Sequence, residues 1–281
     1  MHKIQTFSYH CHTTFSDGRS SIREMVHRAK EIGFTELGIS DHLIVHKNMF
    51  QGECWKYMQE DRAVHVYNNS FKDILPSFQK HCEDIRKIAR EENFKVLVGY
   101  EVDFFTYDGW LEELKEFVGK LDIDYLHSGN HFFFDEKCEN VINMTYLDEI
   151  VKDKSLLNEY IIRHFDIMRQ CVESKMFSFL AHMDYLRRFC SEVYQPNLYS
   201  KEKNAVLNAL EQNNTALEIS TKGLRRINDF YPDALLLDAV SKRNIAMLIN
   251  DDAHNTTELG ADFDKAELAL KNHGITKRFK I

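Results

Sequence analysis

Short runs of consecutive apolar residues recur along the chain, and longer amphipathic stretches separate them. The runs are rich in β-branched, aromatic and aliphatic residues, which is typical of strands. Most are apolar at successive rather than alternating positions, as in strands that helices cover on both faces of a parallel sheet. The pattern predicts seven strands, at Ile4–His12, Glu36–Ser40, Lys95–Val102, Asp124–Ser128, Phe177–Ala181, Thr215–Ser220 and Ile245–Asn250.

The stretches between these runs have helical spacing. The first begins at Ser20 or Ser21, with Glu24 close to capping-box spacing and Gly33 just beyond its end. The second begins at Pro76 and keeps apolar residues at helical spacing. The predicted helices run from Ser20 or Ser21 to Ile32, from Pro76 to Ala89, and over Gly109–Leu121, Ser155–Ser174, Ser200–Gln212, Pro232–Lys242 and Ala261–Asn272.

Strand and helix alternate over the whole length, without a repeat, a low-complexity tract or a linker. This organisation favours a single α/β domain over residues 1–281. Seven units that close on themselves would make a barrel with one strand fewer than the standard eight. An open, doubly wound sheet is the alternative that the alternation alone leaves open.

One segment interrupts the alternation. Residues 46–71 are polar, carry Trp55, Tyr57 and Tyr67, and form a long insertion after the second predicted strand. Long irregular segments in compact domains are often functional lids. A packed surface excursion is the alternative.

Composition and charge narrow the class of protein. With 11 Gly and 3 Pro among 281 residues, the chain lacks the composition of disordered or collagen-like proteins. A net charge of −8 without a basic tract argues against a nucleic-acid or anionic-membrane partner. No apolar stretch reaches the ~18 residues of a membrane helix, and the start lacks the apolar region of a signal peptide. We therefore expect a cytoplasmic protein.

The six cysteines do not form a Cys-x-x-Cys pair. Zinc-ribbon and thioredoxin-like sites therefore have no support. In a cytosolic protein of this length, we expect free thiols in or near the core.

Six of the seven predicted strands deliver a histidine or a carboxylate at their carboxyl end. In barrels and open parallel sheets alike, functional sites are built at that end. Nine candidate metal ligands follow from this pattern: His10, His12, Asp17, His42, Glu101, His131, His182, Asp252 and His254. A single histidine is more often structural, but agreement among six strand ends indicates a metal site.

The local spacing supports this interpretation. In a strand, residues i and i+2 face the same side, so His10 and His12 would project together and Cys11 would point into the core. Asp252 and His254 repeat the arrangement if the backbone stays extended. Imidazole and carboxylate together suit zinc, iron or manganese. One zinc ion needs about four ligands, so nine predict two or three ions.

The same residues carry a resemblance to a known family. His10-x-His12, Asp41-His42, Glu101, His131, His182-x-Asp184 and Asp252-x-His254 resemble, in order and spacing, the polymerase and histidinol phosphatase (PHP) family. Within it, the chain is most similar to the stand-alone histidinol-phosphate phosphatases. The cues are the Ser16-Asp17-Gly18 turn, the size, the long insertion and the Gly223-Leu224-Arg225 turn.

The resemblance implies a distorted seven-stranded (β/α)7 TIM-like barrel with a trinuclear metal centre at the carboxyl ends of the strands. One ion would be held by His10, His12, Glu101 and Asp252. Glu101 would bridge to a second ion, held also by His131 and His182. The third would be held by Asp17, His42 and His254. Many relatives have a histidine at or near the position of Asp17, so the carboxylate is a departure.

The implied activity is hydrolysis of L-histidinol phosphate in histidine biosynthesis, with two or three Zn, Fe or Mn ions as cofactors. A metal-bound hydroxide would attack phosphorus in line. The catalytic candidates are Asp17, His42, Glu101 and Asp252; the sequence does not decide which residue protonates the leaving alkoxide.

A phosphate ester also needs cationic side chains. The candidate substrate-binding residues are Arg163, Arg188, Lys222 and Arg225. The other eight histidines are expected to be structural or at the surface, with His46 the first candidate for an exception.

Three alternatives stay open on the sequence. The substrate of a PHP-type phosphoesterase could instead be a protein phosphotyrosine or an oligonucleotide. An amidohydrolase-type barrel also uses His-x-His and a late aspartate, but no residue here is an obvious bridging lysine. The preferred partner is a small-molecule phosphate ester, with no nucleic acid and no membrane; the oligomeric state does not follow from the sequence.

Overall fold

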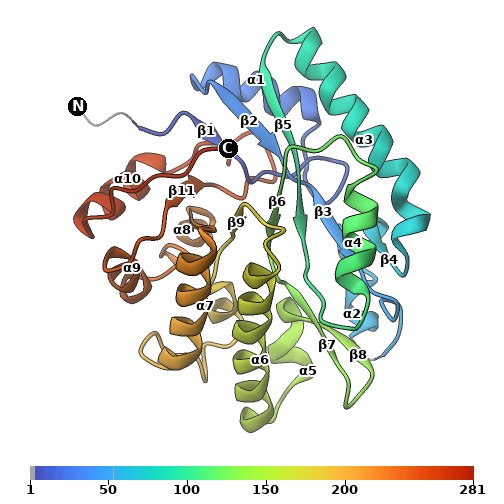
Figure 1. The fold of residues 1–281 in the computed structure, drawn as a ribbon, viewed down its shortest axis with the longest axis vertical. Helices are drawn as coiled ribbons and strands as arrows, with labels where there is room; N and C mark the ends of the chain where they lie inside the picture. The colour runs from blue at the N-terminus through green and yellow to red at the C-terminus, as the bar shows by residue number, and fades with distance from the viewer. Residues whose placement is uncertain (1–3, 53) are drawn as a thin grey trace.

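The computed structural model describes residues 4–52 and 54–281 (Figure 1). His2 and Glu53, the latter within the insertion at 46–71, lie outside the described residues.

The seven predicted strands form one continuous parallel path, and helices surround it (Figure 1). Every neighbouring pair along the path is parallel. The strands in order are β1 (Phe7–Ser8), β2 (Glu36–Ile39), β5 (Lys95–Val102), β6 (Tyr125–Ser128), β9 (Phe179–Leu180), β10 (Ala216–Ser220) and β11 (Met247–Asn250). The path closes almost completely, so the expected seven-stranded TIM-like barrel is confirmed and the open sheet is not.

The seam between β1 and β11 is closed largely by side chains. The Gln5 amide donates to the Ile249 carbonyl at 2.6 Å and accepts from the Ile249 N–H at 3.1 Å. The Tyr9 N–H donates to Asn250 Oδ1 at 2.8 Å. Backbone pairing resumes at Cys11 and Ala253. The predicted strand Ile4–His12 is therefore a regular strand only at Phe7–Ser8. At Gln5 and Tyr9, side-chain hydrogen bonds to β11 replace backbone pairing.

Two pairs of short strands lie outside the seven predicted ones. Directly after β2, the chain forms β3 (His42–Val45), which pairs with the second half of β5 and sets His42 opposite Glu101. The insertion then returns as β4 (Tyr67–Asn68), parallel to β3. An antiparallel hairpin, β7 (Phe132–Asp135) and β8 (Asn140–Asn143), extends from the end of β6.

The helices lie mostly where the spacing predicts them. Helix α1 (Ile22–Glu31) begins with the expected capping box between Ser21 and Glu24, and Gly33 follows with a φ of +79°. The others are α2 (Trp55–Met58), η1 (Val64–Val66), α4 (Trp110–Val118), η2 (Met144–Tyr146), α5 (Leu147–Ile150), α6 (Lys154–Glu173), η3 (Tyr185–Arg188), α7 (Ser200–Asn213), α8 (Lys222–Ile227), α9 (Ala234–Ser241) and α10 (Phe263–Asn272).

Helix α3 (Phe71–Glu91) corrects the prediction that its start lies at Pro76. The Ser70 hydroxyl caps the helix by accepting from the Lys72 N–H at 3.2 Å. Pro76 therefore lies inside the helix, one turn from its start. A proline inside a helix loses its own N–H donor and crowds the carbonyl four residues earlier. The Ser70 cap and the buried face of α3 outweigh this cost near the start of the helix.

The cysteines follow the expectation of free thiols. Five are buried and Cys138 is exposed. Cys11 points away from its histidine neighbours, as the spacing predicts, and contacts the Gly38 carbonyl at 3.1 Å. Among the described helices, none has the length and hydrophobicity needed to cross a membrane.

His46 is a structural histidine rather than a ligand. It is fully buried against Phe105 and Phe134, with ring centroids 4.7 and 4.6 Å away. Its Nδ1 accepts from the Asn48 N–H at 3.1 Å. Burial, helped by Lys47, lowers the pKa of His46 to about 4.

The free energy of unfolding should depend on pH through His46. In the unfolded chain its pKa is about 6.5, so below that pH only the unfolded state takes up the proton, and stability falls as pH drops towards 4. We expect the stability gap between wild type and His46→Asn, which keeps the acceptor, to narrow between about pH 7 and about pH 4.5. Urea unfolding of both metal-free proteins measures this. A constant gap would contradict the assignment.

Candidate metal centre

The nine candidate ligands converge at the carboxyl end of the barrel. Each comes from the end of a strand or from the loop that follows it, so parallel packing of the strands brings them to one edge. Their ligand atoms form four overlapping groups, each within 4.8 Å: His12, Asp17, His42 and His254; His10, His182 and Asp252; His10, His12 and Glu101; and His42, Glu101 and His131.

Glu101 lies at the middle of the cluster. It is 1% exposed, and five histidine rings surround it. Its carboxylate oxygens lie between 3.0 and 3.7 Å from ring nitrogens of His10, His12, His42, His131 and His182. A single carboxylate with ligands on both sides has the geometry of a bridge between two ions.

Two further carboxylates flank this core. Asp17 Oδ2 lies 2.9 Å from His254 Nε2, and Asp17 Oδ1 lies 3.5 Å from His42 Nε2. Asp252 Oδ1 lies 3.3 Å from His12 Nε2 and 3.5 Å from His10 Nε2. The aspartate that departs from the family pattern, Asp17, thus lies beside the other expected members of the third group.

The donor set fits divalent metal ions. Several buried ligand atoms make no hydrogen bond to any described residue, among them His10 Nε2, both nitrogens of His12, Glu101 Oε2 and Asp252 Oδ1. Orphaned buried polar atoms are costly unless something binds them. Two ligand atoms that bind the same zinc ion tetrahedrally, each at ~2.1 Å, lie ~3.4 Å apart. The distances between neighbouring ligand atoms in this cluster are close to that value. The cluster could therefore hold more than one ion.

The electrostatics suit the same role. Burial alone would raise the pKa of Glu101, but His10, His131 and His42 hold it well below its usual range. Burial, with the nearby His42 and His254, lowers the pKa of His12 to about 4. Burial alone would lower the pKa of His10, His42 and His131, but neighbouring carboxylates outweigh burial and raise the pKa of each. An ionised carboxylate and a neutral imidazole are the forms that bind metals, so metal binding would displace protons from these three histidines.

Backbone conformation lets the ligands meet. Asp252 has a φ of +48°, so the extended run expected from Asp252 to His254 is wrong; the turn still points both side chains at the cluster, with His254 Nδ1 3.5 Å from Asp252 Oδ1. Next to His131, a Cβ on Gly129 would lie 2.2 Å from Glu101 Oε1. Only glycine fits there.

Two buried carboxylates that the sequence analysis missed support the histidines from behind. Glu218 Oε2 lies 2.8 Å from His10 Nδ1, and Asp103 Oδ2 lies 3.3 Å from His131 Nδ1. Such partners orient metal-binding imidazoles and make them more basic. The available signal was a carboxylate within or directly after an apolar strand, since Glu218 lies inside β10 and is fully buried.

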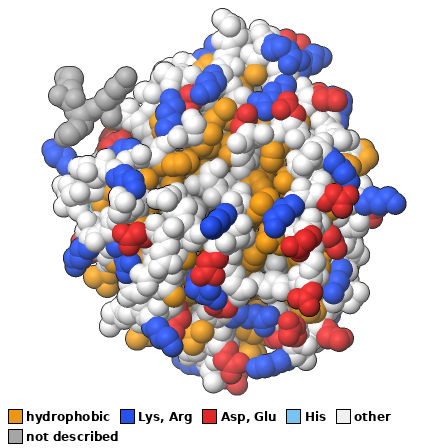
Figure 2. Space-filling model, in the orientation of Figure 1, with side chains coloured by type: hydrophobic (Ala, Val, Ile, Leu, Met, Phe, Trp, Pro, Cys, Tyr) orange, Lys and Arg blue, Asp and Glu red, His pale blue; other side chains and the backbone are white. Residues whose placement is uncertain are grey.

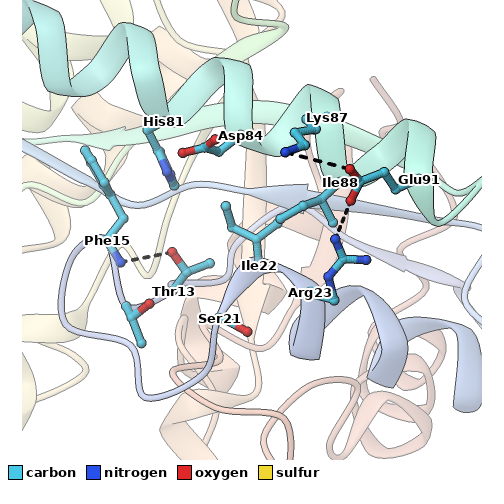
Figure 3. A pocket seen from close by; sticks show the side chains of 11 residues that line it. Thr13, Phe15, Ser21, Ile22, Arg23, His81, Asp84, Lys87, Ile88 and Glu91 are labelled. Atoms are coloured by element: carbon cyan, nitrogen blue, oxygen red, sulfur yellow. Dashed lines mark hydrogen bonds and ion pairs between the residues drawn. The ribbon is translucent and has the colours of Figure 1, made fainter.

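A third carboxylate, Asp41, holds the loop that carries Asp17. It accepts from the Thr13 N–H at 2.7 Å, and the Thr13 and Ser16 hydroxyls donate to it as well. His81 of α3 lies 3.0 Å from its other side. Figure 3 shows His81 beside Phe15, in a cavity of about 560 Å³ between α1 and α3. In that cavity Arg23 and Lys87 both turn towards Glu91 (Figure 3), so these basic groups are paired.

A second cavity, of about 260 Å³, opens directly onto the candidate ligands. One wall carries Asp17, His42, Glu101, His131 and His254. Lys222 also lines it, with Nζ 2.8 Å from Asp252 Oδ2. The insertion supplies Asp61 and Arg62, which the sequence analysis did not single out. The insertion thus forms a wall of this cavity.

The other three cationic candidates make contacts outside the lining of this cavity. Among the described residues that line this cavity, Lys222 is the one member of the predicted set. Arg163 lies 3.9 Å from Asp135 on the hairpin, and Arg188 lies over the Phe189 ring. Arg225 donates to the Asp251 carbonyl and to Thr221 Oγ1.

Comparison with known proteins adds an independent observation. A family model described as the PHP domain matches residues 8–222. The chain is 22% identical over 270 residues to a protein of Deinococcus radiodurans named a probable histidinol-phosphatase, covering 94% of this chain and 92% of that protein. It is 25% identical over 248 residues to a Bacillus subtilis DNA polymerase/3'-5' exonuclease, covering 88% of this chain but 34% of that protein.

A solved structure shows the same fold. It is a histidinol phosphate phosphatase of Lactococcus lactis, described as a complex with zinc, L-histidinol and phosphate. The TM-score is 0.69 at 18% identity, covering 98% of this chain and 96% of that one.

Replacing Glu218 by Gln should weaken metal binding without removing a candidate ligand. The amide keeps the shape but loses the charge behind His10, so we expect a loss of about 10- to 100-fold in affinity for the metal that His10 contacts. Competition with a chelator measures this. The control is Glu60→Gln, which changes an exposed glutamate outside the centre. Equal affinities in the two variants would show that Glu218 does not support the site.

Proposed function

We propose that this chain, which belongs to the PHP domain family, is a metal-dependent phosphomonoesterase that hydrolyses L-histidinol phosphate to L-histidinol and phosphate. The observation that carries the proposal is the convergence of nine candidate ligands, five of which line a cavity that also contains Lys222. The printed names of the relatives from Deinococcus radiodurans and Lactococcus lactis support the choice of substrate.

The residues would divide the metals as the family resemblance implies. His10, His12, Glu101 and Asp252 would hold one ion, and Glu101 would bridge to a second ion with His131 and His182. Asp17, His42 and His254 would hold a third. Bound divalent ions supply charge to neutralise the phosphoryl oxygens and make water more acidic.

The remaining steps fall to side chains of the chain itself. Lys222 lies at the cavity wall and can contact a phosphate oxygen with its ammonium group. Asp17 and His42 line the cavity, whereas Asp252 Oδ2 is engaged by Lys222 at 2.8 Å. Of the catalytic candidates, Asp17 and His42 are therefore better placed than Asp252 to orient a water that protonates the leaving alkoxide. A role for Arg163, Arg188 and Arg225 in substrate binding stays a prediction from the sequence.

A second candidate function is hydrolysis of an oligonucleotide. The similarity to the Bacillus subtilis DNA polymerase/3'-5' exonuclease favours it. Against it stand the net charge of −8 and the face in Figure 2, where Lys and Arg are interspersed with Asp and Glu rather than gathered in a stripe. Nucleic-acid binding relies on clustered positive charge. The same family match makes an amidohydrolase the less favoured alternative.

Replacing Glu101 by Gln should remove both metal and activity. The amide cannot carry the negative charge that bridges two ions, so we expect a lower metal content after dialysis and a fall in turnover of at least about 10²-fold. Elemental analysis and a phosphate-release assay measure the two effects, with Glu60→Gln as the control. Intact metal content together with intact turnover would refute the scheme.

The choice of substrate can be tested directly. We expect kcat/KM of the metal-loaded enzyme to be at least about 10²-fold higher for L-histidinol phosphate than for a phosphotyrosine peptide, p-nitrophenyl phosphate or a short single-stranded DNA, which is ~2.7 kcal/mol of transition-state discrimination. Phosphate release, and nucleotide release for the DNA, measure it. Equal or faster turnover of the other substrates would leave the metal centre standing and reject histidinol phosphate as the dedicated substrate.

A further inference from the structure

Asp61 is an acidic residue that lines the catalytic cavity and is not one of the candidate metal ligands. It comes from the insertion, between α2 and η1, and lines the same 260 Å³ cavity as Asp17, His42 and Lys222. Burial, with the charge of Asp17, raises the pKa of Asp61, and the hydrogen bonds from Tyr146 and Tyr67 and the nearby His42 oppose this only in part. Asp61 is therefore close enough to the metal ligands to sense their charges.

Neutral groups hold the Asp61 carboxylate in place. The Tyr67 hydroxyl donates to Oδ2 at 2.7 Å, Asn143 Nδ2 donates to Oδ2 at 3.4 Å, and the Tyr146 hydroxyl donates to Oδ1. These donors come from β4, β8 and η2, so three separate segments fix one carboxylate. A site held by packing and hydrogen bonds is preorganised for a ligand.

The charge of Asp61 has no cationic counterpart in the part of the chain that the structure describes. No Lys, Arg or His there forms an ion pair with it. The neighbouring Arg62 donates instead to the carbonyl oxygens of Asp17 and Gly18, at 3.1 and 3.4 Å. A carboxylate has about four acceptor positions, and three donors occupy it. One position therefore stays available for a donor from the cavity.

The cavity is consequently polarised. Metal ions held by the candidate ligands would attract a phosphate group, as would Lys222, whereas the Asp61 carboxylate would repel it. A cation on the leaving alcohol is attracted to Asp61, and the aromatic side chains Tyr67, Phe132 and Tyr185 also line this space. A carboxylate beside aromatic rings is a favourable environment for an ammonium group.

We propose that Asp61 is a specificity-determining residue, which binds the ammonium group of an amino-alcohol phosphate while the phosphate lies at the metal centre. This inference rests on the proposed phosphatase activity and deepens it, because it assigns the end of the site that recognises the alcohol. It predicts selection for a cationic leaving group by a residue that takes no part in the chemical step.

The test compares substrates that differ in the amine. The variant is Asp61→Asn, which keeps an acceptor for the tyrosine hydroxyls but loses the charge; Glu60→Gln is the matched control on the adjacent, exposed residue. We expect Asp61→Asn to lower kcat/KM for L-histidinol phosphate by about 10- to 100-fold, mainly through KM. N-acetyl-histidinol phosphate lacks the ammonium charge. For this substrate we expect Asp61→Asn to change kcat/KM by less than about 3-fold.

A structural role would give another result. If Asp61 only ties the insertion to the hairpin, Asp61→Asn will lower kcat/KM for both substrates by the same factor and reduce Tm, and the inference is overturned. Selective loss for the amine substrate at unchanged Tm supports it.

Failure of the proposed function is distinguishable. If the wild type does not prefer L-histidinol phosphate, the proposed substrate is wrong, and the role of Asp61 is then measured with O-phosphoethanolamine and ethyl phosphate, which differ in the amine alone. A preference for phosphoethanolamine that Asp61→Asn abolishes would support the inference, and equal effects on both esters would overturn it.

Discussion

The structure depends on one buried carboxylate, that of Glu101, surrounded by five histidine rings. Removing a carboxylate from water is unfavourable unless positive charge or hydrogen-bond donors compensate for it. Here the compensation comes from side chains that four other strand ends and their loops deliver to the same place. The register of β5 against β3 sets His42 opposite Glu101. The parallel barrel is thus the frame that makes this concentration of ligands possible.

A second layer of acidic residues surrounds this centre and serves it in different ways. Glu218 and Asp103 contact the far nitrogens of His10 and His131, and Asp41 holds the loop that carries Asp17. All three are fully buried. Burying a carboxylate that is not itself a candidate metal ligand is unfavourable for folding. The position of these three carboxylates behind the ligands indicates that they orient the imidazoles and the loop.

The insertion gives the cavity its asymmetry. It contributes short elements of its own and pairs with β3 through β4, so it belongs to the barrel rather than to a separate unit. Asp61 and Arg62 come from the insertion, whereas Lys222 is the first residue of α8, far from the insertion along the sequence. The metal ligands follow from the family pattern, but part of the remaining cavity lining comes from a segment whose sequence has no periodic pattern.

The sequence by itself determined the seven barrel strands, many of the helices and the nine candidate ligands, because apolar runs and polar strand ends are local signals. Tertiary structure alone decided which residues meet. Glu218 and Asp103 support the ligands because barrel closure brings β10 behind His10 and turns Asp103 towards His131. Of the four cationic candidates, only Lys222 is among the described residues that line the cavity, and Arg163 lies instead beside Asp135 of the hairpin. Side-chain direction and long-range pairing depend on packing between elements, and no local pattern records them.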